Sequence, residues 1–327
     1  MNGGQSPQRG RGLLLLLLLC VPAAVFLSLT MGAVRVPWGQ WANASYVPLT
    51  KLRLARAVLG LAVGASLASA GVVFQAMLRN PLADPYVLGV SSGAGLGAAV
   101  AIILHLTALG PWTVPLLAFA GASLTVALVF NLARVGGRIS VHTLLLSGVI
   151  LSAVFGALLM FLVSQASSEG LHGVTWWLLG SLAVSRADAL FYIQLALCAA
   201  GIAACWSFAR ELDLMTLGEE PALHLGVEVE RVKKICLTVA SLLTAVAVSS
   251  AGLIGFVGLL VPHVTRKLVG PAHGRLIPAA ALAGGAFLVL ADAVGRSVIA
   301  PSEVPIGVIT ALCGGPFFLY LLRRRRG

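Results

Sequence analysis

The segment Arg79–Gly89, with the sequence RNPLADPYVLG, constrains the fold of this chain more than any other feature. It is polar and contains two prolines, and it lies between two apolar runs that are each long enough to cross a lipid bilayer. An unpaired backbone amide or carbonyl in the hydrocarbon interior costs several kcal/mol, so an irregular segment there must be covered by protein or lie beside water. We therefore expect Asn80 and Asp84 to lie at a membrane surface or along a wet pathway.

The composition excludes an ordinary soluble domain. Hydrophobic residues make up 59% of the chain and charged residues only 10%, whereas about 25% of a typical soluble domain is charged. The five cysteines lie in or beside apolar runs without the spacing of a metal site, and we interpret them as small apolar side chains. The chain is therefore expected to bury its surface against lipid and neighbouring helices.

Apolar stretches of roughly 20 residues predict an all-α polytopic membrane protein with one transmembrane domain over residues 1–327. The ten predicted spans are residues 13–33, 54–78, 87–108, 112–133, 142–164, 188–209, 233–250, 252–269, 276–294 and 306–322. The first apolar run continues to about Met31, longer than the apolar core of a typical signal peptide, so we interpret it as an uncleaved span.

Basic residues predict the orientation. With both termini in the cytoplasm, sixteen of the 22 Lys and Arg residues fall on the inner side, as the positive-inside rule requires. The six on the outer side are Arg35, Lys51, Arg53, Arg56, Arg186 and Arg296. The net charge of +11 then reflects basic loop ends at anionic headgroups and needs no nucleic acid partner. We expect a multi-pass protein of the cell (inner) membrane.

Residues within the spans indicate close helix packing rather than chemistry. Gly89, Gly93 and Gly97 have the spacing that lets helix backbones approach each other in a membrane. Asp292 and Arg296 are four residues apart and should share one helix face. The spans carry no series of acidic residues for an ion relay, and the chain has no zinc, serine-hydrolase or P-loop motif. If ATP drives this protein, another subunit must bind it.

The longest polar stretch after the N-terminal part is Arg210–Lys234, which holds six of the eleven acidic residues. Leu217, Leu223, Leu225 and Val227 alternate with these charges, which predicts one or two short amphipathic helices on the cytoplasmic side. The segment 210–232 is either a solvated connection between spans or a docking surface for a soluble partner.

A second charged group lies on the predicted outer side, where Lys51, Arg53, Arg56 and Arg296 gather against the overall charge bias. These side chains either extend toward the headgroups from the ends of their helices or receive acidic groups of an external protein.

Several long segments resemble one family, the membrane-spanning subunits of the type II ABC importers that take up iron–siderophores, haem and cobalamin. The matching segments are LRLARAVLGLAVGASLASAGVVFQAMLRNPLADPYVLGVSSGAG from Leu52, LLLSGVILSA from Leu144, WWLLGSLA from Trp176, LGEEPALHLGVEVERV from Leu217, AGLIGFVGLLVPHVTRKLVG from Ala251, LADAVGR from Leu290 and PSEVPIGVITALCGGPFFLYLL from Pro301.

The resemblance implies ten helices per subunit, both termini in the cytoplasm, and a homodimer with the pathway at its interface. It also implies separate ABC ATPase subunits on the cytoplasmic side and an extracytoplasmic substrate-binding protein, with no covalent chemistry and no cofactor in the permease. By the same resemblance, Arg53, Arg56 and Arg296 would dock the binding protein. The residues that would couple to the ATPase are Leu217, Gly218, Glu219, Glu220, Ala222, Leu225 and Gly226.

The resemblance also implies a cytoplasmic gate formed by Asn80, Leu82, Val141 and His142. Val141 and His142 stand where the related protein has two small hydroxyl residues, and so depart from the family pattern.

Taken together, these features predict the permease subunit of an ATP-driven importer. Its expected cargo is an iron compound, either a ferric siderophore or haem, and cobalamin is the alternative. A secondary transporter driven by an ion gradient, an intramembrane enzyme and a structural or receptor protein are the remaining candidates. The first lacks an acidic relay, and the second lacks a nucleophile–base pair or metal set.

Overall fold

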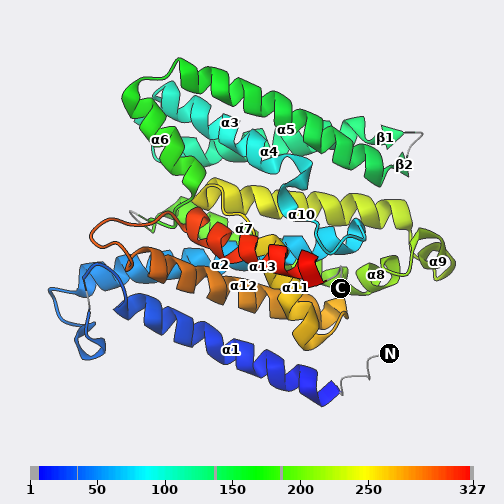
Figure 1. Ribbon diagram of the computed structural model, residues 1–327, viewed down its shortest axis with the longest axis horizontal. Coiled ribbons are helices and arrows are strands. Elements are labelled where there is room, and N and C mark those ends of the chain that lie inside the picture. Colours follow the sequence, from blue (N-terminus) through cyan, green and yellow to red (C-terminus); the bar gives the residue numbers. More distant parts are fainter. Residues whose placement is uncertain (1–6, 35, 136–137, 185–186, 325–327) are drawn as a thin grey trace.

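The computed structural model describes residues 7–34, 36–135, 138–184 and 187–324 (Figure 1). Arg35 and Arg186, two of the basic residues predicted on the outer side, lie outside these ranges. The α-helices of the described residues are α1 (Pro7–Thr30), α2 (Val47–Met77), α3 (Val90–Ile103), α4 (Thr113–Leu132), α5 (Val141–Ser164), α6 (Ser168–Leu179), α7 (Ala189–Ser207), α8 (Ala209–Met215), α9 (Glu219–His224), α10 (Val229–Ala251), α11 (Val257–Val269), α12 (His273–Gly295) and α13 (Ile306–Arg324).

Short elements connect these helices. The 3₁₀ helices are η1 (Trp38–Gln40), η2 (Pro85–Leu88) and η3 (Leu106–Leu109). Two antiparallel strands, β1 (Arg134–Val135) and β2 (Arg138–Ile139), form a small hairpin in which Arg134 pairs with Ile139. This hairpin leads directly into α5, whose first turn is capped by the Ser140 hydroxyl accepting from the Thr143 amide.

A helix lies in each of the ten ranges predicted as spans, and the fold is that of an all-helical polytopic membrane protein. Among the described residues, six helices are long and apolar enough to cross a membrane: α2, α4, α5, α7, α10 and α12. Apolar helices of fewer than 18 residues lie at Leu14–Thr30, Val90–Ile103 and Ile306–Leu321. Helix α6 falls outside the predicted ranges, and α8 and α9 are the two short helices expected in segment 210–232.

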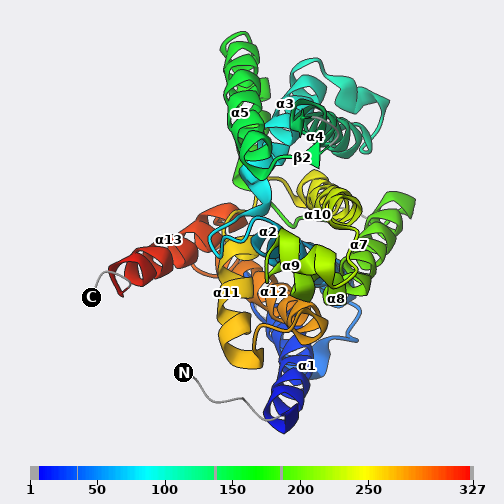
Figure 2. The same cartoon turned by 90° about the vertical axis from the view of Figure 1, so that its right-hand side faces the viewer.

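The long helices run side by side along one direction (Figure 1). Helices α3, α4 and α5 form one group, α2, α10 and α12 lie at the centre, and α1 packs along the far side of α12 (Figures 1 and 2). The large, fully buried side chains lie mostly on the central helices, among them Phe74 of α2, Leu237 of α10 and Leu288 of α12. This central group therefore provides the core on which the rest of the bundle rests.

Glycine allows the closest contacts between helices. A methyl group on Gly64 of α2 would collide with the carbonyl of Gly284 on α12, and one on Gly284 would collide with the carbonyl of Gly64. Gly93 of α3 has the same relation to Gly121 of α4, and Gly97 packs on the carbonyl of Leu117. These contacts confirm the predicted small-residue packing of the 89–97 stretch, which matters in a membrane because apolar side chains gain little there over lipid.

The two ends of the bundle carry different structures. At one end lie the start of α1, the β1–β2 hairpin, α8, α9 and the end of α13 (Figure 1). We call this the α9 end. At the opposite end lie the connection between α1 and α2, helix α6 and the loop between α12 and α13 (Figure 1). Arg53, Arg56 and Arg296 belong to this opposite end, which we call the arginine end.

Candidate functional site

The polar segment Arg79–Gly89 is folded by its own side chains. Asn80 Oδ1 accepts a hydrogen bond from the Leu82 amide at 2.9 Å, and Asp84 caps η2 by accepting from the Tyr86 amide at 2.8 Å. Gly89 ends the segment in the left-handed region at φ 77°, where glycine avoids the strain of a side chain. The segment is therefore a built turn between α2 and α3 rather than an unstructured loop.

Tyr86 joins this segment to a break between two helices. Its hydroxyl donates to the Ile254 carbonyl at 3.0 Å and accepts from the Ile254 amide at 3.1 Å. Ile254 lies in the non-helical stretch between α10 and α11, where backbone groups lack helical partners. One phenol thus satisfies both polar groups of a buried residue, as irregular backbone at membrane depth requires.

The four predicted gate residues lie in two pairs. Asn80 and Leu82 are exposed in the turn after α2, and Val141 and His142 begin α5, with His142 exposed. None of the described hydrogen bonds joins one pair to the other. The turn and α5 do pack together further along, because Gly148 of α5 lies against the backbone of Val87 and Leu88.

Two of the three arginines predicted to dock a binding protein, Arg56 and Arg296, share the carboxylate of Asp292, and Arg53 lies close to Arg296. We call Arg53, Arg56, Arg296, Asp292 and Glu303 the arginine cluster. Arg56 Nε donates to Asp292 Oδ1 at 2.8 Å, and its two terminal nitrogens bind Glu303 at 3.1 and 2.7 Å. Arg296 Nε donates to Asp292 Oδ2 at 2.9 Å, which confirms the i, i+4 pair predicted from the sequence.

Arg53 and Arg296 also donate hydrogen bonds to backbone carbonyls at and after the end of α1. Arg53 donates to the carbonyls of Leu29 and Val34, and Arg296 donates to those of Ser28 and Met31. Each of the two arginines is only 5% exposed. Three of these carbonyls belong to the end of α1 or the residue after it, where backbone acceptors lack helical partners and the helix dipole favours a cation. These two arginines therefore cap α1 in addition to any external role.

Glu303 is the member of the arginine cluster that sequence reasoning missed. It lies in the loop between α12 and α13, is 45% exposed in its side chain, and holds both terminal nitrogens of Arg56. The available signal was an acidic residue between Pro301 and Pro305, seven positions after Arg296. Spacing in the sequence could not show that this loop folds back over α2.

The predicted docking segment forms a compact knob at the α9 end. Gly218 and Gly226 flank α9 with φ values of 124° and 84°, conformations that favour glycine. Ala222 is the fully buried residue of α9, while Leu217, Leu223 and Leu225 are all exposed. Glu220 is exposed as well. An apolar and acidic surface of this kind, on two short helices, is suited to contact with a partner protein.

Beneath this knob, Lys233 of α10 joins three elements. Its ammonium lies 2.9 Å from Glu219 Oε1 of α9, 3.2 Å from Glu230 Oε1 and 3.2 Å from the Ile139 carbonyl of β2. We call Lys233, Glu219, Glu230 and the backbone of Ile139 the lysine node. In the sequence Lys233 is one of the basic residues on the predicted inner side, and its i, i+3 spacing from Glu230 is the local signal of a partner.

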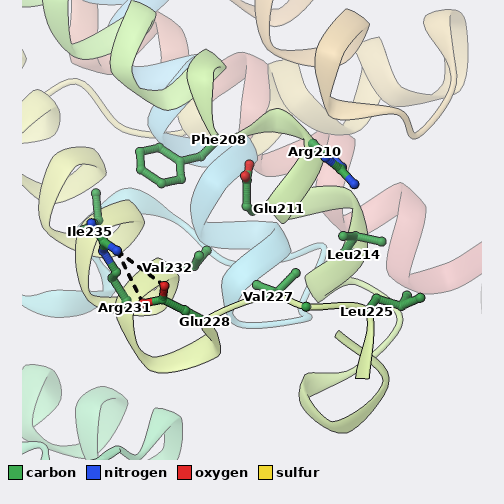
Figure 3. A pocket seen from close by; sticks show the side chains of 11 residues that line it. Phe208, Arg210, Glu211, Leu214, Leu225, Val227, Glu228, Arg231, Val232 and Ile235 are labelled. Carbon is green, nitrogen blue, oxygen red and sulfur yellow. Dashed lines mark hydrogen bonds and ion pairs between the residues drawn. The ribbon is translucent and has the colours of Figure 1, made fainter. Parts of the chain in front are cut away.

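A hollow of about 310 Å³ lies between α8, the 225–228 connection and α10 (Figure 3). Phe208 and Glu211 line one side, and Arg231 pairs with Glu228 on the other at 3.4 Å (Figure 3). No group of three or more His, Cys, Asp or Glu residues suited to a metal ion occurs in the part of the chain that the structure describes. The hollow is therefore a feature of the surface between α8, α10 and the segment that follows α9.

Comparison with known proteins shows which family this chain resembles. Residues 16–324 match the FecCD transport family. The chain is 48% identical to the cobalamin import system permease protein BtuC of Halobacterium salinarum, over 84% of this chain and 73% of the relative. It is 36% identical to the hemin transport system permease protein HmuU of Yersinia pestis, over 100% of this chain and 98% of the relative.

The fold is similar to a solved structure reported as an inward-facing conformation of an ABC transporter assigned to the metal-chelate type. The TM-score is 0.86, the sequence identity is 32%, and the match covers 96% of this chain and 99% of the other.

Proposed function

The chain belongs to the FecCD transport family and is the permease subunit of an ABC importer, and from this premise we propose that it imports a large metal chelate as one half of a homodimer. A permease of this family works with ABC ATPase subunits and is not itself an enzyme. The observation that carries the proposal is the pair of dissimilar charged surfaces at opposite ends of one helical bundle. An external binding protein and an internal ATPase need such a pair.

The cargo is one of the metal chelates that this family carries. The cargo expected from the sequence is an iron compound, either a ferric siderophore or haem, with cobalamin as the alternative. The relative named as a cobalamin permease is 48% identical to this chain and the relative named as a hemin permease is 36% identical, which favours cobalamin as the first cargo to test.

The homodimer is supported by one face of the bundle. Helices α5 and α13 flank the turn after α2 on this face (Figure 2). Both helices expose large apolar side chains, among them Val149 and Ile150 of α5 and Leu312 of α13. Two copies paired across this face would cover these apolar side chains and enclose the polar turn between the subunits. The cytoplasmic gate of Asn80, Leu82, Val141 and His142 would then form from both subunits.

The arginine end is the proposed docking surface for the binding protein. Arg56 reaches the exposed Glu303, while Arg53 and Arg296 lie beneath and add positive charge. Complementary charge of this kind steers encounter and fixes register more than it adds affinity. A carboxylate of the binding protein would take the position on Arg56 that Glu303 holds in the isolated subunit.

The α9 end is the proposed docking surface for the ATPase. Leu223 and Leu225 supply exposed apolar contacts, and Glu219 and Glu220 supply charge around them. This assignment makes the α9 end cytoplasmic, together with both ends of the chain, and the protein a component of the cell (inner) membrane. The excess of basic residues on that side supports the same orientation.

Reconstitution tests the proposed function. The permease is incorporated into liposomes with its cognate ATPase and binding protein, and uptake of cobalamin, haem and a ferric siderophore is measured with and without ATP. We expect ATP-dependent uptake of one of the three cargoes. Uptake by the permease alone under an ion gradient would instead establish a secondary transporter. Absence of a disulfide-linked dimer with Leu82→Cys would contradict the shared gate.

A further inference from the structure

We infer that Lys233 is the positioning residue that couples α9 to the β1–β2 hairpin and so transmits ATPase-driven motion to the start of α5. The inference rests on the proposed function, because it takes α9 as the helix on which the ATPase acts. It adds a residue that neither the composition nor the family resemblance assigns to transport. Three observations carry it: the geometry of the ammonium, its burial, and the use of the Ile139 backbone.

The ammonium of Lys233 has as many acceptors as it has protons. A lysine carries three N–H donors and no acceptor. Glu219 Oε1, Glu230 Oε1 and the Ile139 carbonyl lie 2.9, 3.2 and 3.2 Å from Nζ, and each can take one of the three protons. These acceptors come from α9, α10 and β2. One side chain thus joins three elements that are separate in the sequence.

The position of Lys233 is costly without these acceptors. The residue is only 3% exposed, so its ammonium has given up most of its water. It also lies near the N-terminus of α10, where the helix dipole disfavours a cation. A chain that needed only packing at this point could use an apolar residue, since a buried ion pair is seldom more stable than its apolar replacement. The charge is therefore better explained by linkage than by stability.

Glu230 completes the linkage through its second oxygen. Its Oε2 accepts from the Ile139 amide at 2.8 Å, while its Oε1 faces Lys233. Both backbone polar groups of Ile139 are thereby held by side chains of α10. Ser140, the next residue, caps α5 and is followed by Val141 and His142. A shift of α9 is relayed through Glu219 and Lys233 to the first turn of α5 within a few contacts.

The neighbouring residue provides a matched control. Lys234 also belongs to α10, but its residue is exposed, and none of the described hydrogen bonds or ion pairs joins it to the acceptors of Lys233. Lys234→Met removes the same charge from the same helix turn without touching the three acceptors of Lys233. A difference between the two variants therefore reports on the lysine node and not on the charge of this end.

The test uses the complete importer in liposomes and measures ATP hydrolysis and cargo uptake in the same samples. We expect Lys233→Met to lower the cargo moved per ATP by about tenfold, because mutations within a coupling network change the coupling by such factors. Lys233→Arg should recover part of this ratio, since a guanidinium can reach the same carboxylates. Lys234→Met should leave the ratio at the wild-type value.

Glu219→Gln keeps the inference testable if Lys233→Met does not assemble. It removes one charged contact and leaves Glu230 to hold the ammonium, and it too should lower the cargo moved per ATP. An unchanged ratio in Lys233→Met, or in Glu219→Gln where the lysine variant fails to assemble, overturns the inference. Failure of the wild-type importer to move cargo with ATP overturns the proposed function instead, so the two failures are distinguishable.

Discussion

The arginine cluster and the lysine node are both charge networks built around buried cations, but they join different kinds of structure. The arginine cluster links α1, α2 and α12, long helices that already pack along much of their length. The lysine node links α9, which has six residues, and a hairpin of two-residue strands to the start of α10. Charge reinforces extensive helix packing in the first network and the small buried contact of Ala222 in the second. A charge network can therefore serve either as a fixed platform, where it stabilises helices that already pack together, or as a linkage, where it connects short elements that have little packing of their own.

Loss of Asp292 should produce the largest effect on stability. Asp292 is 3% exposed and is shared by Arg56 and Arg296. Asp292→Ala would leave Arg296 buried without a carboxylate, and breaking a buried pair in this way costs about 3–5 kcal/mol. We expect a clear fall in the thermal denaturation temperature of the purified permease in detergent.

The control for this variant is Glu303→Gln, which removes the exposed carboxylate of the same cluster and should leave the denaturation temperature close to that of the wild type. If the Asp292→Ala variant and the wild type have the same denaturation temperature, the arginine cluster does not act as a stabilising platform.

Leu223 tests the α9 end with a smaller effect that concerns binding rather than folding. Its side chain is 61% exposed, so Leu223→Asp should leave the fold intact. A charge at an apolar contact should weaken association with the ATPase by at least about tenfold. The association is measured by titrating the ATPase against permease in nanodiscs.

Leu109→Asp is the matched control, because Leu109 is exposed to a similar degree in η3, outside the docking segment. Undiminished ATPase binding by the Leu223 variant would remove α9 from the docking surface.

Substitution of Glu303 tests how accessible the arginine cluster is to the binding protein. Glu303→Gln should free the terminal nitrogens of Arg56 and tighten docking of the binding protein by about threefold, since an exposed ion pair is worth little. The measurement is a binding titration at low and high salt, and the gain should shrink as salt rises. Weaker docking would show that Glu303 itself contacts the binding protein.

Asp84 lies outside both networks and sharpens the comparison, because the one described hydrogen bond of its side chain comes from the Tyr86 amide and not from a cation. Burial raises the pKa of Asp84 from 3.8 to about 6. The folded-state pKa is thus above the unfolded value, so this residue stabilises the fold fully below pH 4 and loses that contribution as the pH rises through 6.

Asp84→Asn keeps the cap on η2 and cannot ionise. Its free energy of unfolding should therefore gain about 2 kcal/mol on the wild type between pH 4 and pH 7. Denaturation is measured at both pH values, and a parallel pH response in the two proteins would contradict the assignment.

Sequence reasoning found the elements that local physics defines. The apolar runs predicted where helices lie, and the glycine spacing at Gly93 and Gly97 predicted the close approach of α3 to a neighbouring helix. The i, i+4 spacing predicted the Asp292–Arg296 pair because both residues lie on one helix. The resemblance brought together Arg53, Arg56 and Arg296, and the structure places all three in one cluster.

Contacts between residues far apart in the sequence could not be predicted from local patterns. Nothing in the spacing of Arg53 shows that its guanidinium would cap α1, and nothing near Lys233 points to the Ile139 carbonyl 94 positions away. The helix α6 was also missed, because its 12 residues are too few for a span.

The sequence by itself determined that this chain is a helical membrane protein of an importer family, because hydropathy and short-range spacing act over a few residues and leave their mark in local order. Only the tertiary structure decided which charges meet. Glu303 reached Arg56 and Glu219 reached Lys233 through loops whose paths depend on how the long helices pack, and that packing is a property of the whole bundle.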